Sequence, residues 1–150
     1  MASSWYNKGV YLVLSGGINL SSNTLKVVLV TSSYTFDPDH NFVSDVNANE
    51  LTVGGYTGGF GGAGRKTLSN KAFTEDDSSN LAYFDDTVDQ TWTSLATGET
   101  IGGAIIIREV TNDSDSPVLM FMDVTNTPTN GGNITIAWNA SGIAQLVVTP

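Results

Sequence analysis

The sequence contains no cysteine, a single histidine and only six basic residues in 150 positions. Without cysteine there is no disulfide framework, no thiolate nucleophile and no Cys-based zinc site. A Ser-His-Asp arrangement would depend on His40 alone, and no GxSxG elbow occurs anywhere in the chain. No apolar run approaches the roughly 20 residues needed to span a bilayer. The first five residues lack the basic segment of a signal peptide, so we expect synthesis in the cytoplasm and no membrane partner.

The charge balance is strongly acidic, with 15 acidic residues against 6 basic ones and a net charge of −9. Such a field repels phosphate backbones, and the basic residues are scattered along the sequence, so we expect no nucleic-acid binding. Two acidic clusters, at residues 75–77 and at 85, 86 and 89, are typical of solvated loops. Because no acid-base or cationic partner recurs beside them, we expect no enzymatic activity and no cofactor.

Length and hydrophobic content predict one domain over residues 1–150 that buries a hydrophobic core without disulfide or metal cross-links. Short strand patterns recur with turn residues between them and without long helical periodicity, which is typical of an all-β antiparallel β-sandwich, jelly-roll-like or immunoglobulin-like. The expected strands cover residues 24–31, 71–74, 81–84, 90–95, 103–110, 118–124, 133–138 and 143–148. The expected core residues are Val28, Leu29, Ile105, Ile106, Ile134 and Trp138. Residues 113–117 and 129–133 are expected to form hairpin-like loops.

A short helix is expected from Trp5 to about Leu14, capped by Ser3 or Ser4 and ended by Gly16. Its second half is also rich in β-formers, so a strand is an alternative there. Asp37 or Asp39 can cap one helical turn farther along, which would direct Phe42 and Val46 inward. A loose calcium site that uses Asp37, Asp39 and Asp45 is the alternative to this capping role.

The segment 54–64 contains seven glycines among eleven residues, and its only large side chains are Tyr56 and Phe60. No regular element can be sustained there, so we expect a long, exposed, Gly-rich loop. Residues 59–64 match GxGxxG, but strand-prone sequence follows where a dinucleotide site requires a helix. We expect the loop to become ordered on a partner, with Tyr56 and Phe60 filling pockets and Arg65 and Lys66 pairing with acidic groups.

The alternative for this segment is a passive loop whose aromatic side chains pack on the protein's own sheet. The other expected partner contact is the N-terminal segment, with the alternative of a helix that covers one end of the sandwich. Its contact residues are Trp5, Tyr6 and Lys8.

Three sequence motifs stand out. The first is WYNKG at residues 5–9, followed by GINL at 17–20 and TLKVVLV at 24–30. The second comprises residues 34–36 with His40, Phe42 and residues 44–46. The third is TPTNGGNITIAW at 127–138, a Pro-x-Asn-Gly-Gly-x-Ile-x-Ile-x-Trp pattern. Together these motifs resemble a family of small structural proteins of tailed-bacteriophage particles, and the resemblance covers the first third and the last fifth of the chain.

This resemblance implies a virion protein without catalytic residues. The first hypothesis is a capsid decoration (cement) protein that binds the major capsid protein and forms homo-oligomers on the particle. A tail, neck or fibre-associated protein with host-facing loops is the second. A carbohydrate-binding module is a third, from another class, because exposed aromatic residues on a β-sandwich can stack on sugars.

Overall fold

The structure of the protein is a computed structural model that describes residues 2–149. Its first elements are strand β1 (Ala2–Trp5), helix α1 (Asn7–Leu14), strand β2 (Leu25–Thr31) and the 3-10 turns η1 (Val43–Asp45) and η2 (Asn47–Asn49). Strands β3 (Lys66–Thr67), β4 (Lys71–Asp76), β5 (Leu81–Asp86) and β6 (Gln90–Trp92) follow. The chain ends with β7 (Thr100–Arg108), β8 (Val118–Pro128), β9 (Ile134–Ile136) and β10 (Ala144–Val147).

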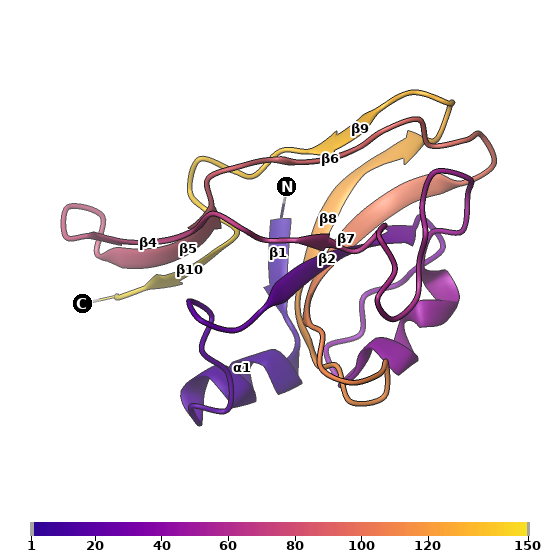
Figure 1. The fold of residues 1–150 in the computed structure, drawn as a ribbon. Coiled ribbons are helices and arrows are strands. Elements are labelled where there is room, and N and C mark those ends of the chain that lie inside the picture. The colour runs from indigo at the N-terminus through magenta and orange to yellow at the C-terminus, as the bar shows by residue number, and fades with distance from the viewer. Residues whose placement is uncertain (1, 150) are drawn as a thin grey trace.

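The strands form three antiparallel sheets (Figure 1). The main sheet has five strands in the order β1-β8-β7-β2-β3, and every neighbouring pair in it is antiparallel. A second sheet has the order β10-β5-β4, and β6 pairs with β9 in a third. The predicted all-β class with antiparallel pairing and a short N-terminal helix is therefore confirmed.

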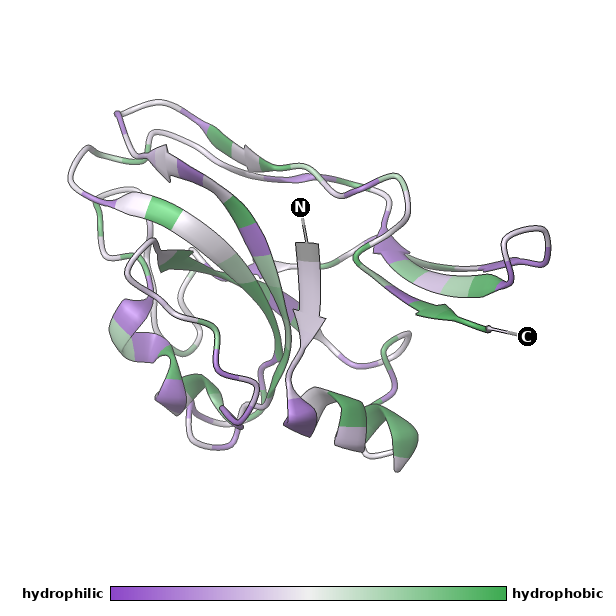
Figure 2. Ribbon diagram, turned by 180° about the vertical axis from the view of Figure 1, so that it is seen from behind, coloured by the Kyte–Doolittle hydropathy of each residue, from purple (hydrophilic) through white to green (hydrophobic). Residues whose placement is uncertain are grey.

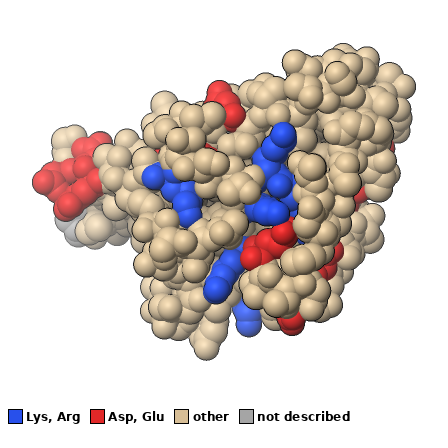
Figure 3. Space-filling model, in the orientation of Figure 1, with Lys and Arg blue, Asp and Glu red and all other residues tan. Residues whose placement is uncertain are grey.

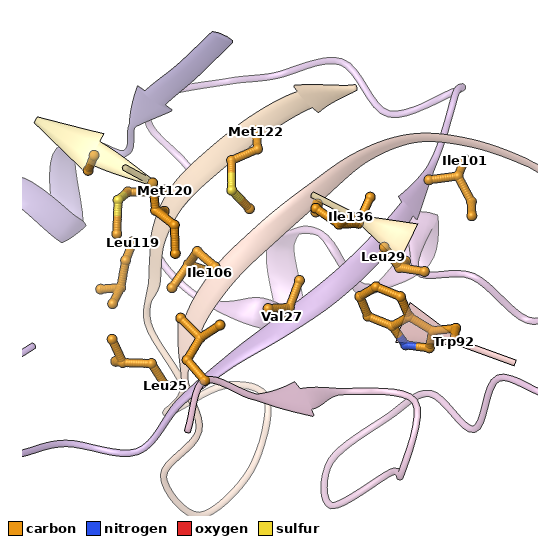
Figure 4. Packing of buried hydrophobic residues seen from close by; sticks show 14 of the residues in the cluster. Leu25, Val27, Leu29, Trp92, Ile101, Ile106, Leu119, Met120, Met122 and Ile136 are labelled. Carbon is orange, nitrogen blue, oxygen red and sulfur yellow. The ribbon is translucent and has the colours of Figure 1, made fainter. Parts of the chain in front are cut away.

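The main sheet buries both of its faces. Along β2, Leu25, Val27 and Leu29 enter one hydrophobic cluster, whereas Val28 and Val30 enter a second cluster on the opposite face. This alternation follows from the two-residue period of a strand, and it explains why residues 25–30 are almost uniformly apolar. Figure 4 shows the first cluster, in which side chains from β2, β7 and β8 meet Trp92 of β6 and Ile136 of β9.

Most of the expected core residues are buried as predicted. Val28, Leu29, Ile105 and Ile106 are all fully buried. Ile134 and Trp138 are only partly buried, because they pack at the margin of the first cluster. The strand predictions are confirmed at these positions except Trp138, because β9 ends at Ile136.

The N-terminus differs from the prediction. Residues 2–5 form β1, which pairs with β8 from Ala2 opposite Asp123 to Trp5 opposite Met120. The helix begins only at Asn7 and has no side-chain cap, so the expected caps Ser3 and Ser4 are wrong. Its end is as expected, since Gly16 has a φ of 73° just after the last turn. Residues 2–5 therefore pair with the distant strand β8 and do not cap α1.

The Gly9 position explains how α1 can lie so close to the main sheet. A Cβ atom added there would collide with the backbone carbonyl of Leu119 in β8. The close approach is supported by a 3.1 Å hydrogen bond from the Tyr6 N–H to the Leu119 carbonyl. Only glycine can occupy this point of contact between α1 and β8.

The expected hairpins divide into one correct and one wrong prediction. Residues 113–117 connect β7 to β8, which pair directly, as predicted. Residues 129–133 instead connect two different sheets, because β9 pairs with β6 rather than with β8. Local sequence located the turn but could not identify the partner of the following strand.

The β4, β5 and β10 sheet projects from the body of the molecule, and we call it the arm (Figures 1 and 2). At its base, Phe84 and Ala144 are buried in the first hydrophobic cluster. Phe73, opposite Phe84 on the edge strand β4, is 52% exposed, and Leu146 farther out on β10 is 68% exposed. The arm is therefore anchored in the core at one end and uncovered at the other.

Candidate interaction site

The N-terminal segment is anchored by Tyr6, whose side chain is fully buried. Its hydroxyl lies 2.7 Å from the Tyr34 hydroxyl, which lies 3.1 Å from Nδ1 of His40. The Tyr6 ring packs against Phe36 with 5.0 Å between ring centroids. Burial, followed by the hydrogen bond with Tyr34, raises the pKa of Tyr6, so this phenol stays neutral. The only histidine is thus part of a structural hydrogen-bond chain.

These contacts correct part of the predicted partner surface. Tyr6 belongs to the protein's own core and is not available to a partner. Trp5 is half-buried and packs against the first cluster. Lys8 is half-buried at the start of α1, with its ammonium 5.3 Å from the Phe42 ring centroid and 5.8 Å from that of Tyr11.

The Gly-rich segment at 54–64 is folded back on the body by Tyr56. This side chain is only 5% exposed, and its hydroxyl accepts a hydrogen bond from the Leu29 N–H and donates one to Glu50 Oε1, both at 3.1 Å. The Gly64 N–H closes the segment on the Thr57 carbonyl at 2.9 Å. Burial, and then the charge of Glu50, raises the pKa of Tyr56.

Arg65 is the centre of a buried ion-pair network. Its guanidinium binds Glu50 through Nε and Nη2 at 2.9 and 2.7 Å, and Asp113 through Nη1 and Nη2 at 2.6 and 3.1 Å. Burial lowers the pKa of Arg65, but the hydrogen bonds and charges of the two carboxylates outweigh this effect and raise it. The hydrogen bonds from Arg65 in turn hold the pKa of Asp113 below its ordinary value. Both contacts are bidentate, which is the strongest geometry available to a guanidinium.

The expectation that Tyr56 and Arg65 face a partner is therefore wrong. The alternative, in which the aromatic residues of the segment pack on the protein itself, is correct for Tyr56. Phe60 is different, since it stands at a turn with 47% of its side chain exposed. Lys66 is half-buried in β3. Of the segment's predicted contacts, Phe60 and Lys66 are the two that a partner can still reach.

Helix α1 presents an apolar outer face that sequence reasoning did not single out. Its sequence is NKGVYLVL, so only the first two residues are polar. Leu12 and Val13 pack against the core, yet Val10, Tyr11 and Leu14 are 39%, 62% and 80% exposed. The helix is apolar all round and is coloured accordingly in Figure 2. A helix of this kind is ordinarily covered on all sides.

The arm presents further exposed apolar side chains, and these were also missed. Val147, the last residue of β10, and Val148, which follows it, are 56% and 68% exposed, next to Leu146. The predicted strand at 143–148 contained the signal, because its residues are apolar at nearly every position instead of alternating. This pattern is typical of a strand that is covered on both faces.

Acidic side chains gather at the end of the arm. Figure 3 shows this group there, whereas over the body of the molecule basic and acidic side chains lie side by side. The acidic group of the arm belongs to the end of β4 and the turn that follows it, where Glu75 and Asp77 are exposed.

The aspartates of the 37–45 loop serve the backbone. Asp37 accepts the Asp39 N–H at 3.0 Å, and Asp45 accepts the N–H groups of Asn41 and Phe42 at 2.9 and 3.0 Å. The last two bonds lower the pKa of Asp45. Within residues 2–149, no group of three or more acidic or histidine side chains has the arrangement of a metal site.

A groove lies between the outer part of β8 and β9. It is lined by Ile101, residues 123–125, Thr127 and residues 133–137, and none of these lining residues is aromatic. The exposed aromatic residues Tyr11, Phe60 and Phe73 stand on three separate elements. The most exposed aromatic side chains of the described residues therefore do not share one strand or helix.

Comparison with models of known protein families, with curated proteins and with solved structures gave no match for this chain. Among residues 2–149 there is no helix with the length and apolar character required to cross a membrane.

Proposed function

We propose that the protein is a capsid decoration (cement) protein of a tailed bacteriophage, which binds the major capsid protein and acts by assembly rather than by catalysis. The proposal begins from the three motifs at residues 5–30, 34–46 and 127–138 that resemble small phage structural proteins. We infer that the fold is a sandwich, in which the β6 and β9 ribbon and the base of the arm form a second layer over the main sheet. The packing of Trp92, Ile136 and Phe84 on that sheet supports this arrangement.

The observation that carries the proposal is the outer face of α1. Val10, Tyr11 and Leu14 expose apolar surface on a helix whose other side is held rigidly against β8 through Gly9. An exposed apolar face on an anchored helix gains free energy when a partner covers it. Lys8 adjoins this face and can pair with acidic groups at the rim of the contact. The capsid-binding surface is therefore the outer face of α1, with Phe60 as a second contact.

The test is particle retention after the outer face is made polar. The double variant Tyr11→Ser/Leu14→Ser removes two large apolar groups that the isolated protein exposes by 62% and 80%. Each group contributes about 1.5–3 kcal/mol when it is covered by a partner, so binding should weaken by roughly two orders of magnitude or more. The melting temperature of the isolated variant should be almost unchanged, because surface substitutions cost within about 0.5 kcal/mol.

The measurement is the amount of protein that stays on particles of the phage that encodes it after sedimentation, quantified on gels. A matched control is Val88→Ser, since Val88 is 49% exposed on a loop away from α1, and it should remain bound. A decoration protein should occur in many copies per particle, whereas a tail, neck or fibre component would occur in few. Low copy number, or retention of the double variant at the wild-type level, would contradict the proposal.

A further inference from the structure

The arm has two outer edges with opposite character. Strand β4 forms one edge and carries Lys71, Glu75 and Asp76. Strand β10 forms the other edge, and its sequence Ala-Gln-Leu-Val contains no charge. Proteins ordinarily protect an exposed edge strand with charged residues, proline or a bulge, because unpaired backbone groups invite another strand. By this criterion β4 is protected and β10 is not.

The side chains of β10 are exposed on both faces of the arm. Successive residues of a strand point to opposite faces, so Leu146 lies on one face and Val147 on the other. Their exposed fractions are 68% and 56%, and Val148 beyond them is 68% exposed. The outer part of the arm is thus a single layer with apolar groups on both sides, which is rarely stable in isolation.

The free edge of β10 has backbone groups that are ready to pair. The Val148 N–H donates to the Asn80 carbonyl at 2.7 Å, in the same register that places Val147 opposite Leu81 of β5. Because N–H directions alternate along an antiparallel strand, the N–H groups of Gln145 and Val147 point away from β5 toward the free edge.

The charges of the arm and its base favour one orientation of an incoming strand. The β4 and β5 hairpin contains five carboxylates and one lysine. Glu75, Asp76 and Asp77 lie at its outer end, whereas Asp85 and Asp86 stand opposite Ala72 and Lys71 at its base. Near the base, Lys71 donates to the Asn23 carbonyl, while Lys66 and Arg108 stand opposite Val27 and Leu25 in the main sheet. Val27 and Leu25 belong to the cluster into which the arm's base packs, so both basic side chains share that face. Within residues 2–149, none of these three basic side chains has a carboxylate within salt-bridge distance.

We propose that β10 pairs antiparallel with β10 of a second copy of this chain, so that two arms form one continuous six-stranded sheet. Antiparallel pairing keeps the acidic outer ends of the two arms apart and places each beside the base of the other arm, where Lys71 stands with Asp85 and Asp86. Parallel pairing would bring two acidic outer ends together. The two copies are related by a two-fold axis, the commonest symmetry of soluble oligomers. Leu146, Val147 and Val148 are then covered by their counterparts. Association stops at two copies because the outer edges of the joined sheet are the charged β4 strands.

This dimer rests on the proposed function, because it specifies the contact within the homo-oligomer expected on the particle. It forms in the isolated protein and does not require the capsid. Its failure is therefore distinguishable from failure of capsid binding, which α1 provides. The test is the molar mass of the purified protein by sedimentation equilibrium, which should be twice 15.8 kDa at micromolar concentration. The substitution Val147→Pro removes an N–H that β5 does not use and should weaken dimerisation roughly a hundredfold or more. Val147→Thr keeps both the N–H and the branched shape, so it should remain dimeric.

A second measurement does not depend on any variant. Amide hydrogen exchange by NMR should show slow exchange at Gln145 and Val147, the outward-facing positions, and faster exchange there on dilution to the monomer. Charge reversal by Glu75→Lys/Asp77→Lys should weaken association about tenfold at low salt, and high salt should restore part of the loss. The control Asp123→Lys reverses an exposed charge on β8 and should leave the mass unchanged.

Three results would overturn the proposal. The first is a wild-type protein that is monomeric at 100 times the concentration expected to dimerise it, about 100 μM. The second is an oligomer that is unchanged by Val147→Pro, since another surface would then hold it together. The third is protection of Val147 only in complex with a different virion protein, which would make that protein the occupant of the edge.

Discussion

Substitution of Arg65 by methionine should strongly destabilise the protein, because it leaves buried carboxylates without their partner. The Arg65 side chain has no exposed surface, and Glu50 is only 6% exposed. The change removes four hydrogen bonds to Glu50 and Asp113. It also removes a cation 3.8 Å from Glu109 Oε2, although Lys26 remains 2.7 Å from the other oxygen of that carboxylate. Glu109 Oε2 is buried and has no hydrogen-bond partner within the described residues.

The expected cost is about 3–5 kcal/mol, the range found when one member of a buried ion pair is removed. For a chain of this length, that corresponds to a fall in melting temperature of roughly 10 °C or more. Urea unfolding monitored by circular dichroism measures the free energy directly. The neighbouring Lys66→Met is the matched control, since Lys66 is half-buried and no carboxylate within the described chain lies in salt-bridge range of it. This control should change the free energy of unfolding by no more than about 0.5 kcal/mol.

A double variant separates loss of the ion pair from loss of packing. Adding Glu50→Gln to Arg65→Met removes the stranded charge, so the double variant should be more stable than the sum of the two single changes predicts, with a coupling of about 1–3 kcal/mol. A cost below about 1 kcal/mol for Arg65→Met, with the native spectrum retained, would refute the reasoning. It would mean that water or a rearranged segment 54–64 replaces the guanidinium.

Two further predictions follow from the same structure. Gly9→Ala should destabilise the protein by about 1–3 kcal/mol, because the new Cβ meets the Leu119 carbonyl and forces α1 away from β8. The control is Gly16→Asn, which should be tolerated because Gly16 is exposed and left-handed, and thermal unfolding distinguishes the two variants. The pKa of Asp113 is depressed by hydrogen bonds from Arg65 and that of Asp45 by backbone N–H groups, so both contribute stability above the unfolded value near 4 that is lost as the pH falls through their folded pKa values. Denaturant midpoints measured from pH 6 to pH 2 should therefore decline below about pH 4, and less steeply in Arg65→Met; a decline of equal slope in both proteins would contradict this account.

Local pattern predicted most of the strands. The apolar residues at 25–31 predicted a strand that is buried on both faces. Gly16 predicted the end of α1, where the structure gives it a positive φ. These features depend on residues that are neighbours in the sequence. Turn chemistry also located residues 113–117 between two paired strands.

Long-range pairing could not be predicted in the same way. Residues 2–5 offer good helix caps, but the backbone ladder with β8 more than 100 residues away stabilises them as a strand. The strand at 134–136 pairs with β6 instead of its predecessor β8 for the same kind of reason. Which strands meet depends on the free energy of closing the whole core, and no short window of sequence contains that information.

The candidate sites show the same division. Sequence alone predicted that this chain is rich in antiparallel strands, and it determined that the chain is acidic, lacks cysteine and has a single histidine. The burial of Tyr56 and Arg65 depends on their hydrogen bonds to Glu50 and Asp113. Asp113 is 48 positions from Arg65 in the sequence. The glycine-rich segment is ordered because such distant residues satisfy its polar groups. The exposure of α1 and of β10 was likewise a tertiary result. An apolar residue is identified by sequence, but whether its surface is covered depends on how far the core extends.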